Sequence, residues 1–336
     1  MLVFAAETSC DETSICLMEN SSILEHITFS QAIHRMHGGV VPELASRSHL
    51  EKIQIITNDL FNNKKIEPKE IDVFTATCGP GLIGCLLVGS TFTKSLAISF
   101  NKPFVPTNHL EGHILSTSFN NNIKFPNLIL LLTGGHTQVY LMKSENEIEL
   151  LGQSVDDAIG EAFDKTAKLI GLSYPGGSEI EQQALKGNED KFVLPKPLVK
   201  EKNFNFSFSG IKTSINLLTK KNKIDKKFVE DLSASFQKNI TEILIEKLER
   251  GLKRLSSENK NIRSISVVGG VSNNKYIRSK IENFFVKKNI EIYYPIKEMM
   301  GDNAAMIAWA CMKFYKKDRN DLFFKPMPRL GIRSVL

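Results

Sequence analysis

LVFAAETSCDETSICLM, residues 2–18, decides the fold expected for this chain, together with its counterpart LILLLTGGHTQVYLM at residues 128–142. Each stretch begins with a short apolar run, passes through a turn of hydroxyl groups with acids or glycines, and continues into a second apolar run. This pattern predicts a β-hairpin. A third apolar segment, 265–268, ends in Gly269-Gly270 and leads into a predicted helix near Ser272. Hairpins in both halves, with helices following them, indicate a duplicated α/β architecture.

Length and composition place the chain among soluble globular proteins. Its 336 residues predict about two domains, and no Ser/Gly linker marks the boundary, which we place near Asn122. The hydrophobic share of 42% and the charged share of 24% exclude a collagen-like or wholly disordered chain. The longest evident apolar run, 304–312, is too short to span a bilayer. Five cysteines without a C-x-x-C pair and no signal-peptide pattern after Leu2 favour a cytoplasmic location.

Several further elements follow from local patterns. Apolar residues between Phe236 and Leu255 recur at helical spacing and predict a long amphipathic helix. The segment 304–316 predicts a buried helix with Asp302 or Asn303 as its N-cap. The polar stretch 143–149 predicts an exposed loop.

The positive charge of the chain is concentrated in one tract. The whole sequence has a net charge of +6, but residues 191–227 carry ten lysines against Glu201 and Asp225, so this tract has +8 and the rest of the chain −2. Such a tract is typical of a phosphate-binding surface or of ordinary solvated charge. Within it, Phe204, Phe206 and Phe208 alternate with polar residues and predict a strand that buries one face.

Two histidines, His109 and His113, lie four residues apart. On a helix this spacing places both imidazoles on one face, as in many two-histidine metal sites, although capping or surface histidines have the same spacing. The pair lacks the adjacent glutamate of the H-E-x-x-H peptidase motif, so a metallopeptidase is a weak alternative. Asp302, at a helix start, is a candidate third ligand.

Glycine pairs at 134–135, 176–177 and 269–270 predict turns whose backbone N–H groups can approach an anion. A single such pair is more often only a tight turn, but three of them favour nucleotide binding. Acids between Asp156 and Asp164 precede Lys165 on a predicted amphipathic helix. Either they are simply solvated, or Asp164 accepts a hydrogen bond from a ligand hydroxyl.

Taken together and in order, these motifs carry a resemblance to a known family. The motifs are Glu7-Thr-Ser-Cys-Asp-Glu-Thr13, His37-Gly-Gly-Val-Val-Pro-Glu-Leu-Ala-Ser-Arg47, Asn108-His-Leu-Glu-Gly-His113, Gly134-Gly-His-Thr-Gln138, Gly160-Glu-Ala-Phe-Asp-Lys165, Tyr174-Pro-Gly-Gly177, Phe206-Ser-Phe-Ser-Gly210, Gly269-Gly-Val-Ser272 and Asp302-Asn-Ala-Ala-Met306. The chain resembles the TsaD family of bacterial tRNA threonylcarbamoyltransferases, once called glycoproteases, from about residue 3 to residue 310.

The resemblance implies an α/β, two-lobed fold of the actin, heat-shock-chaperone and sugar-kinase (ASKHA) type, with duplicated ribonuclease H-like domains and a cleft between them. The N-terminal lobe would comprise residues 1–122, completed by a C-terminal helix at about 303–336. The C-terminal lobe would comprise residues 123–302.

The resemblance also implies transfer of a threonylcarbamoyl group from threonylcarbamoyl-adenylate to N6 of the adenosine at tRNA position 37, in tRNAs that read codons beginning with adenine. It implies one divalent metal, Fe²⁺ or Zn²⁺, with Fe²⁺ preferred, bound by His109, His113 and Asp302. Threonylcarbamoyl-adenylate or ATP would occupy the cleft. It further implies TsaB-like and TsaE-like partner proteins and a TsaC-type synthase that supplies the adenylate, with no membrane partner. The residues that would hold the adenylate are Leu132, Thr133, Gly134, Gly135, His136, Asp164, Gly177, Glu181 and Asn274.

We hypothesise that Asp11 or Glu12, in the first hairpin turn, takes the proton of the attacking amine. The chain departs from the family pattern at Thr133, where serine is usual, at Asn273, where alanine is usual, and at Gly301, where threonine is usual; Gly301 predicts a looser backbone before Asp302. The remaining alternatives are an ATP-dependent small-molecule kinase of the same fold, which would not need the histidine pair, and a non-catalytic TsaB-like scaffold, which should have lost the metal ligands.

Overall fold

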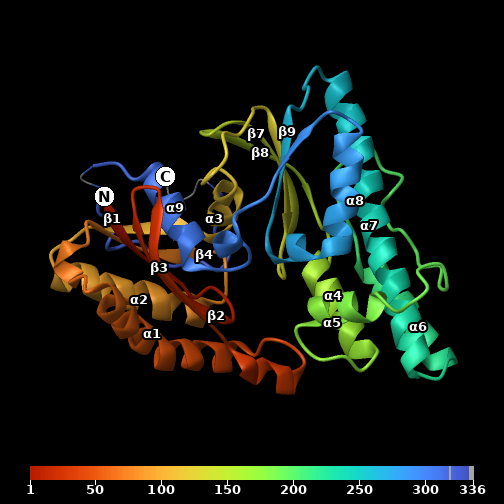
Figure 1. Cartoon of the computed structure of the whole chain (residues 1–336), viewed down its shortest axis with the longest axis horizontal. Helices are drawn as coiled ribbons and strands as arrows, with labels where there is room; N and C mark the ends of the chain where they lie inside the picture. Colours follow the sequence, from red (N-terminus) through yellow and green to blue (C-terminus); the bar gives the residue numbers. More distant parts are fainter. Residues whose placement is uncertain (318, 333–336) are drawn as a thin grey trace. The chain divides into compact units, whose positions relative to one another are not determined.

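The computed structural model describes residues 1–317 and 319–332, and the remaining residues, Asp318 and 333–336, are not described. Two compact units make up the chain (Figure 1). Unit 1 comprises Met1–Asn120 together with Pro295–Leu336, and unit 2 comprises Asn121–Tyr294. Asp302 therefore belongs to unit 1, with the two histidines. None of the helices within 1–317 and 319–332 is long and apolar enough to cross a membrane.

Unit 1 contains a five-stranded mixed sheet in the order β3-β2-β1-β4-β5. The strands are β1 (Leu2–Glu7), β2 (Glu12–Glu19), β3 (Ser22–Ser30), β4 (Val73–Gly79) and β5 (Phe104–Asn108). The first three form an antiparallel meander, while β4 and β5 continue the sheet in parallel with β1. Every residue of β4 and β5 is buried, as expected for parallel strands covered on both faces.

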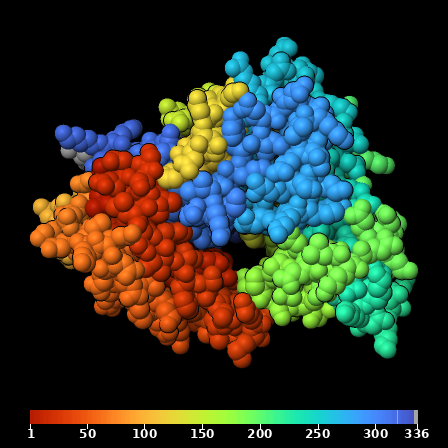
Figure 2. All heavy atoms as spheres, in the orientation of Figure 1, coloured from red at the N-terminus to blue at the C-terminus, as the bar shows by residue number. Residues whose placement is uncertain are grey.

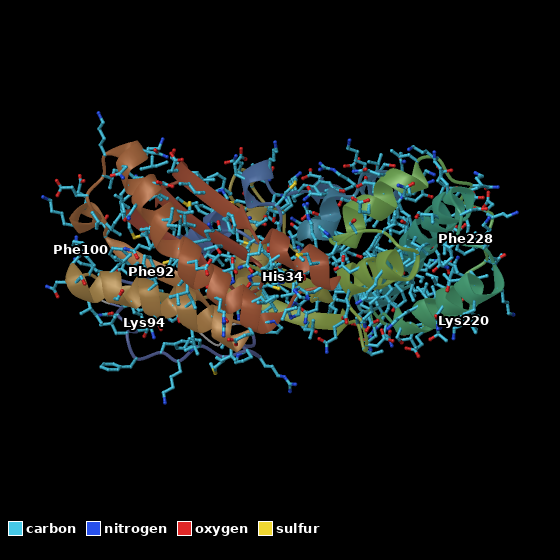
Figure 3. The ribbon with its side chains drawn as sticks, turned by 90° about the horizontal axis from the view of Figure 1, so that it is seen from below. His34, Phe92, Lys94, Phe100, Lys220 and Phe228 are labelled. Carbon is cyan, nitrogen blue, oxygen red and sulfur yellow. The ribbon has the colours of Figure 1, made fainter. Side chains whose placement is uncertain are left out.

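Helices cover both faces of this sheet. Those of unit 1 are α1 (Pro42–Lys64), α2 (Ile83–Ser99), α3 (His109–Ser116) and α9 (Ala304–Phe314), with 3₁₀ turns at Ala32–His37, Pro68–Glu70 and Lys297–Met299. α1 packs beside α2 on one face, and α3 packs beside α9 on the other (Figure 1). Phe92 of α2 and Phe100, which directly follows α2, are labelled in Figure 3; both pack against a core that contains Phe4, Phe74 and Phe104.

Unit 2 contains a second five-stranded sheet in the order β10-β9-β6-β7-β8. The strands are β6 (Asn127–Leu132), β7 (Thr137–Ser144), β8 (Glu147–Gln153), β9 (Ser264–Val268) and β10 (Glu291–Tyr293). Again the first three form an antiparallel meander, and β9 and β10 continue the sheet in parallel with β6. The strand order and strand directions repeat those of unit 1, so the duplication expected from the paired hairpins is confirmed.

The helices of unit 2 pack around one large apolar core that includes Phe163, Phe204, Phe206, Phe208 and Phe236. They are α4 (Ile159–Leu169), α5 (Gly176–Ala184), α6 (Ser209–Lys221), α7 (Lys226–Ser257) and α8 (Lys275–Val286), with a 3₁₀ turn at Gly270–Asn273. The apolar stripe from Phe236 to Leu255 lies on α7 and is buried, as the helical spacing predicts.

Three local expectations are wrong. The stretch 143–149 is mostly exposed, as expected, but it is not a loop, because β7 extends to Ser144 and β8 begins at Glu147, so only the hairpin tip remains. Phe204, Phe206 and Phe208 are all buried but form no strand; Phe206 makes only an isolated bridge to Ser154. The C-terminal helix ends at Phe314, and the described chain beyond it contains no helix. The expected extent of that helix to residue 336 also includes residues outside the described ones.

Candidate functional site

The two histidines of the candidate metal centre lie on the first turns of α3. This helix begins directly after β5, and the Asn108 side chain caps it by accepting the backbone N–H groups of Leu110 at 2.8 Å and Glu111 at 3.3 Å. Because His109 and His113 are four residues apart on this helix, their rings lie on one face, with ring centroids 4.8 Å apart.

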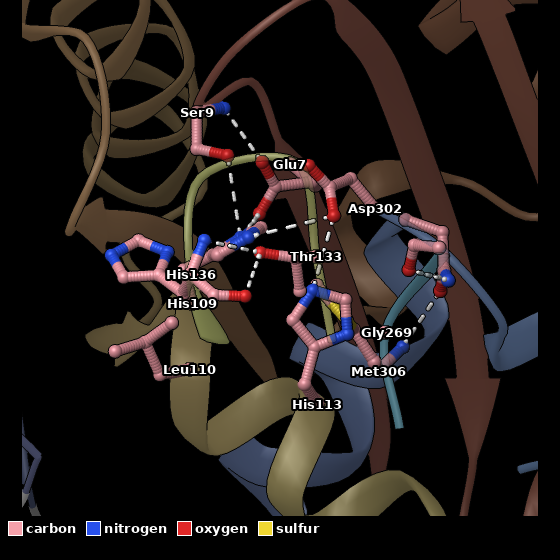
Figure 4. Close-up of polar contacts among 12 residues, drawn as sticks. Glu7, Ser9, His109, Leu110, His113, Thr133, His136, Gly269, Asp302 and Met306 are labelled. Atoms are coloured by element: carbon pink, nitrogen blue, oxygen red, sulfur yellow. Dashed lines mark hydrogen bonds and ion pairs between the residues drawn. The ribbon is translucent and has the colours of Figure 1, made fainter. Parts of the chain in front are cut away.

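Asp302 brings the third donor from the segment that precedes α9. Its Oδ1 lies 3.0 Å from His113 Nε2 and 3.6 Å from His109 Nε2. One donor atom from each of the three residues can be chosen so that all lie within 4.8 Å of one another, and Figure 4 shows the three side chains converging. Both histidines are buried.

The backbone before Asp302 adopts a left-handed conformation at Gly301. Gly301 has φ +77°, a left-handed conformation that glycine adopts at no steric cost, and its carbonyl accepts the side-chain amide of Asn303 at 2.9 Å. Asn303 also caps α9 by accepting the Met306 N–H at 3.0 Å. The expectation that Gly301 loosens this segment stays a prediction, and of the two expected caps Asn303 is the one observed.

Glu7, at the end of β1, orients the first histidine. Its Oε2 lies 3.1 Å from His109 Nδ1, and its Oε1 accepts the backbone N–H of Ser9 at 2.6 Å. Burial lowers the pKa of His109, but the carboxylates of Glu7 and Asp302 outweigh it and raise that pKa to about 9. Burial likewise raises the pKa of Glu7, but His109 outweighs it and the net pKa is below its ordinary value.

The donor set fits a divalent transition metal. With Nδ1 of His109 directed at Glu7, Nε2 of the same ring is left to face Asp302, which is the carboxylate–histidine arrangement that orients metal ligands. Two imidazole nitrogens and one carboxylate oxygen suit Zn²⁺ and Fe²⁺. The negative charges that keep a proton on His109 would equally stabilise a bound cation.

The turn between β1 and β2, residues 7–12, is called the acidic turn below. Burial raises the pKa of Glu12 well above its ordinary value, and the neighbouring carboxylates of Asp11, Asp302 and Glu7 raise it further. Burial and the same cluster raise the pKa of the Cys10 thiol as well. The charge of Asp302, in the candidate metal centre of unit 1, therefore acts on the acidic turn.

Unit 2 brings its own predicted residues together, beginning with the turn between β6 and β7, residues 133–136, called the glycine turn below. Thr133 closes it: its backbone N–H donates to the His136 carbonyl, and its Oγ1 accepts the His136 N–H, both at 2.9 Å. A Cβ added at Gly134 or Gly135 would meet nothing within 4 Å, so both glycines border open space.

Hydrogen bonds tie the start of α4 to this turn. The α4 residues Gly160 and Glu161 donate their N–H groups to the carbonyls of Thr133 and Gly134. Further along α4, Asp164 accepts the N–H of Gly176, next to Gly177, at 2.7 Å.

A further hydrogen bond connects α5 to the start of α8. Glu181 on α5 accepts the N–H of Lys275 at 2.7 Å, and the neighbouring Asn274 donates its side-chain amide to Gln237 Oε1 at 2.8 Å. Beside these helices lies a pocket of about 770 Å³ whose lining includes Glu181, Gln237 and Tyr276. Pockets of this size hold small organic ligands.

The basic tract lies on unit 2. Lys220 and Lys221 occupy the last turn of α6, and Lys226 and Lys227 the first turn of α7; all four are exposed. Figure 2 shows this end of α6 at the surface, and Lys220 is labelled in Figure 3. Lys227 pairs with Asp231 at 2.8 Å, so part of the tract's charge is neutralised within the unit.

Sequence reasoning did not assign a role to Glu7 or Ser9, which contact His109. The signal for Glu7 was present, because a carboxylate directly after an apolar strand lies at the sheet edge where functional side chains gather. No spacing rule links it to a histidine 102 residues away.

The family model of TsaD, tRNA N6-adenosine threonylcarbamoyltransferase, matches residues 22–309. A curated relative of that description from Thermosipho africanus is 43% identical over 335 residues, covering 99% of this chain and 100% of the relative. Another from Pelagibacter ubique is 43% identical and covers 98% of this chain and 94% of the relative.

Solved structures with low sequence identity share the fold alone. Full-length HypF has a TM-score of 0.56 at 14% identity, covering 92% of this chain and 45% of that one. Component A of the Acidaminococcus fermentans (R)-2-hydroxyglutaryl-CoA dehydratase has a TM-score of 0.52 at 11% identity, covering 92% and 95%. The expected two-lobed α/β class of the actin-like type is thereby confirmed. With near-complete coverage at about two-fifths identity, the chain belongs to the TsaD family of tRNA N6-adenosine threonylcarbamoyltransferases.

Proposed function

We propose that the chain transfers the threonylcarbamoyl group of threonylcarbamoyl-adenylate to N6 of the adenosine at position 37, in tRNAs that read codons beginning with adenine. The observation that carries this proposal is the convergence of His109, His113 and Asp302 in a chain of this family. A small-molecule kinase has no use for that triad, and a scaffold without activity has no need to keep it.

The reaction needs no covalent enzyme intermediate, because the phosphate of the adenylate already activates the carbonyl. The N6 amine attacks the carbamoyl carbon and forms the C–N bond, the bond from that carbon to the phosphate oxygen breaks, and AMP leaves. The chain's main contribution is to hold the donor and the weakly nucleophilic amine in reacting geometry.

Within unit 1, His109, His113 and Asp302 would hold the metal, while Glu7 keeps the His109 ring in its orientation. A bound metal would polarise the carbonyl or orient the phosphate. Two histidines and one carboxylate with further positions open favour Fe²⁺, with Zn²⁺ as the alternative. Asp11 or Glu12 would take the proton released by the amine.

Within unit 2, the backbone N–H groups of Gly134 and Gly135 would receive the phosphate of the donor, because the space beside both glycines is open. Asp164, Gly177, Glu181 and Asn274 would hold the nucleoside of the adenylate or of ATP. Of these residues, Glu181 lines the neighbouring pocket.

We propose further that TsaB-like and TsaE-like proteins assist the chain and that a TsaC-type synthase supplies the adenylate. Leu50 and Ile55 on α1 and Leu87 on α2 are exposed, and this is apolar surface that a protein partner would bury. The tRNA acceptor would use the lysines of the basic tract.

The test is to incubate unmodified tRNA with threonine, bicarbonate, ATP, the synthase and the partner proteins, with and without this chain. Nucleoside analysis should show threonylcarbamoyl-adenosine only when the chain is present, and only in tRNAs that read codons beginning with adenine. A matched tRNA with guanosine at position 37 is the control. Equal modification without the chain would overturn the proposal.

A further inference from the structure

Three successive backbone carbonyl groups of the acidic turn each accept a hydrogen bond, and each donor comes from a different segment of unit 1. The Ser9 carbonyl accepts the backbone N–H of Leu82 at 2.9 Å, and the Asp11 carbonyl accepts that of Gln31 at 3.2 Å. Between them, the Cys10 carbonyl faces Nε2 of His49, on α1, at 3.0 Å. His49 is the only side chain among these three donors, and it is fully buried.

The chemistry of its partners fixes the protonation of His49. A carbonyl oxygen only accepts, so Nε2 of His49 must carry the proton that it donates to Cys10. Nδ1 then accepts, which agrees with Thr13 Oγ1 at 2.8 Å from it; the Gln31 side-chain nitrogen lies 3.2 Å from Nδ1 and 3.4 Å from Nε2. Burial lowers the pKa of His49, which favours this neutral form.

The same reasoning gives the direction of the hydrogen bonds that lead from Val41 to His49. The backbone N–H of Val41 donates to His34 Nδ1 at 3.3 Å, so Nε2 of His34 carries a proton and donates it to Gln31 Oε1 at 2.9 Å. The Gln31 amide nitrogen then donates to Ala45 and toward His49. All hydrogen bonds along Val41, His34, Gln31, His49 and Cys10 therefore run in one direction, and burial lowers the pKa of His34 as well.

We propose that His49 is a positioning residue for the transferase reaction, fixed as its Nε2–H tautomer by Gln31 and His34, and that it holds the acidic turn so that Asp11 and Glu12 are correctly placed. The expected effect on activity rests on the proposed function, whereas the tautomer of His49 and its hydrogen bonds do not. The next residue after Cys10 carries a candidate catalytic carboxylate, so we expect loss of the bond to the Cys10 carbonyl to shift that carboxylate, although the carbonyls of Ser9 and Asp11 stay bonded. His34 and Gln31 extend the chain to Val41, the N-cap of α1.

The kinetic test uses two substitutions at one position. His49→Leu removes the donor, whereas His49→Gln keeps an N–H donor at about the same reach. We expect His49→Leu to lower kcat about 30-fold, because displacement of a reacting group by a fraction of an ångström has effects of this order. KM for tRNA and the bound metal per chain should stay unchanged, and His49→Gln should recover kcat to within about threefold of the unsubstituted chain.

Gln31→Leu should have a smaller effect than His49→Leu, because Thr13 still holds Nδ1 of His49. Thr57→Val is the matched control: Thr57 is also buried on α1, but it bonds only to its own helix, at the Ile53 carbonyl. All rates are taken per folded chain, measured by circular dichroism. Unchanged kcat in His49→Leu, or an equal loss in His49→Gln, would overturn the positioning role.

An independent measurement does not depend on activity. In the full chain with ¹⁵N-labelled histidine, the nitrogen resonances of His49, assigned by their loss in His49→Gln, should report a neutral ring protonated at Nε2. Protonation at Nδ1 instead would contradict the proposed chain of donors. If the unsubstituted protein shows no transfer with all partners present, the proposed function fails. The tautomer of His49 then decides by itself whether the series of hydrogen bonds exists.

Discussion

The acidic turn of unit 1 and the glycine turn of unit 2 occupy the same place in two copies of one topology, between the first two strands of each sheet. The acidic turn carries Glu7, Asp11 and Glu12, and surrounding segments hold its backbone. The glycine turn carries no charge at Gly134 and Gly135, and nothing approaches the position of a side chain there.

The difference shows how a duplicated sheet can serve two chemistries. In unit 1 the first turn uses its side chains, so its backbone groups are already bonded to Leu82, His49 and Gln31. In unit 2 the turn has no side chains at its glycines, and its carbonyls at Thr133 and Gly134 are bonded to α4, so we propose the N–H groups of the two glycines for the ligand. Substitutions should therefore act through the removal of side-chain chemistry in unit 1 and through added bulk in unit 2.

The largest effect is expected at the candidate metal centre. Asp302→Ala removes one of three metal donors, and a metal contributing several kcal/mol to the reaction predicts a loss of about 10³-fold in kcat/KM. Metal content, measured by elemental analysis, should fall in parallel. Asp72→Ala, an exposed aspartate of unit 1, is the control and should change neither quantity. Full activity in metal-free Asp302→Ala would exclude the triad.

Within the acidic turn, Asp11→Asn removes a proton acceptor while keeping size and polarity. We expect transfer to fall about 10²-fold, the usual contribution of a general base. Binding of the adenylate, measured by calorimetry, should not change, because the residues proposed to bind it lie in unit 2. Normal transfer by Asp11→Asn would show that Asp11 takes no proton; the same measurement on Glu12→Gln then tests the other candidate.

In the glycine turn, the expected effects come from bulk. A Cβ at Gly160 would lie 2.6 Å from Gly134 Cα and 2.8 Å from the Thr133 carbonyl oxygen. Gly160→Ala should therefore lower the free energy of unfolding by about 2 kcal/mol, measured by urea denaturation, and should weaken adenylate binding. Gly135→Ala, with open space around it, should leave stability within about 0.5 kcal/mol and affect only the ligand. Equal stability of the two variants would show that α4 does not support the turn.

The sequence predicted the paired hairpins, the helical histidine pair and the buried stripe on α7, because each depends on local periodicity. That Asp302 lies close to His109 could be predicted only from the family resemblance, since residues so far apart in the chain share no local pattern. Phe204, Phe206 and Phe208 were misread for a physical reason. All three rings are buried, as a strand with one buried face would also require, but the backbone pairs with a neighbouring segment only at Phe206, and α6 begins at Ser209. The series of hydrogen bonds from His34 to Cys10 could not be predicted from the sequence either, because the tautomers that give it a direction depend on tertiary structure.

The smallest effect is expected on the basic tract, which belongs to unit 2 alone. Reversing Lys220, Lys221, Lys226 and Lys227 to glutamate should weaken tRNA binding about tenfold or more and flatten its dependence on salt, by about 0.7–0.9 in the logarithmic slope for each phosphate that the chain no longer neutralises. Lys227 should contribute least, because Asp231 already pairs with it. The matched comparison is the double reversal of Lys220 and Lys221 against that of Lys287 and Lys288, which are exposed on the same unit after α8. If both doubles change the slope equally, the tract is only part of a diffuse positive surface; if only the first does, α6 binds the tRNA backbone.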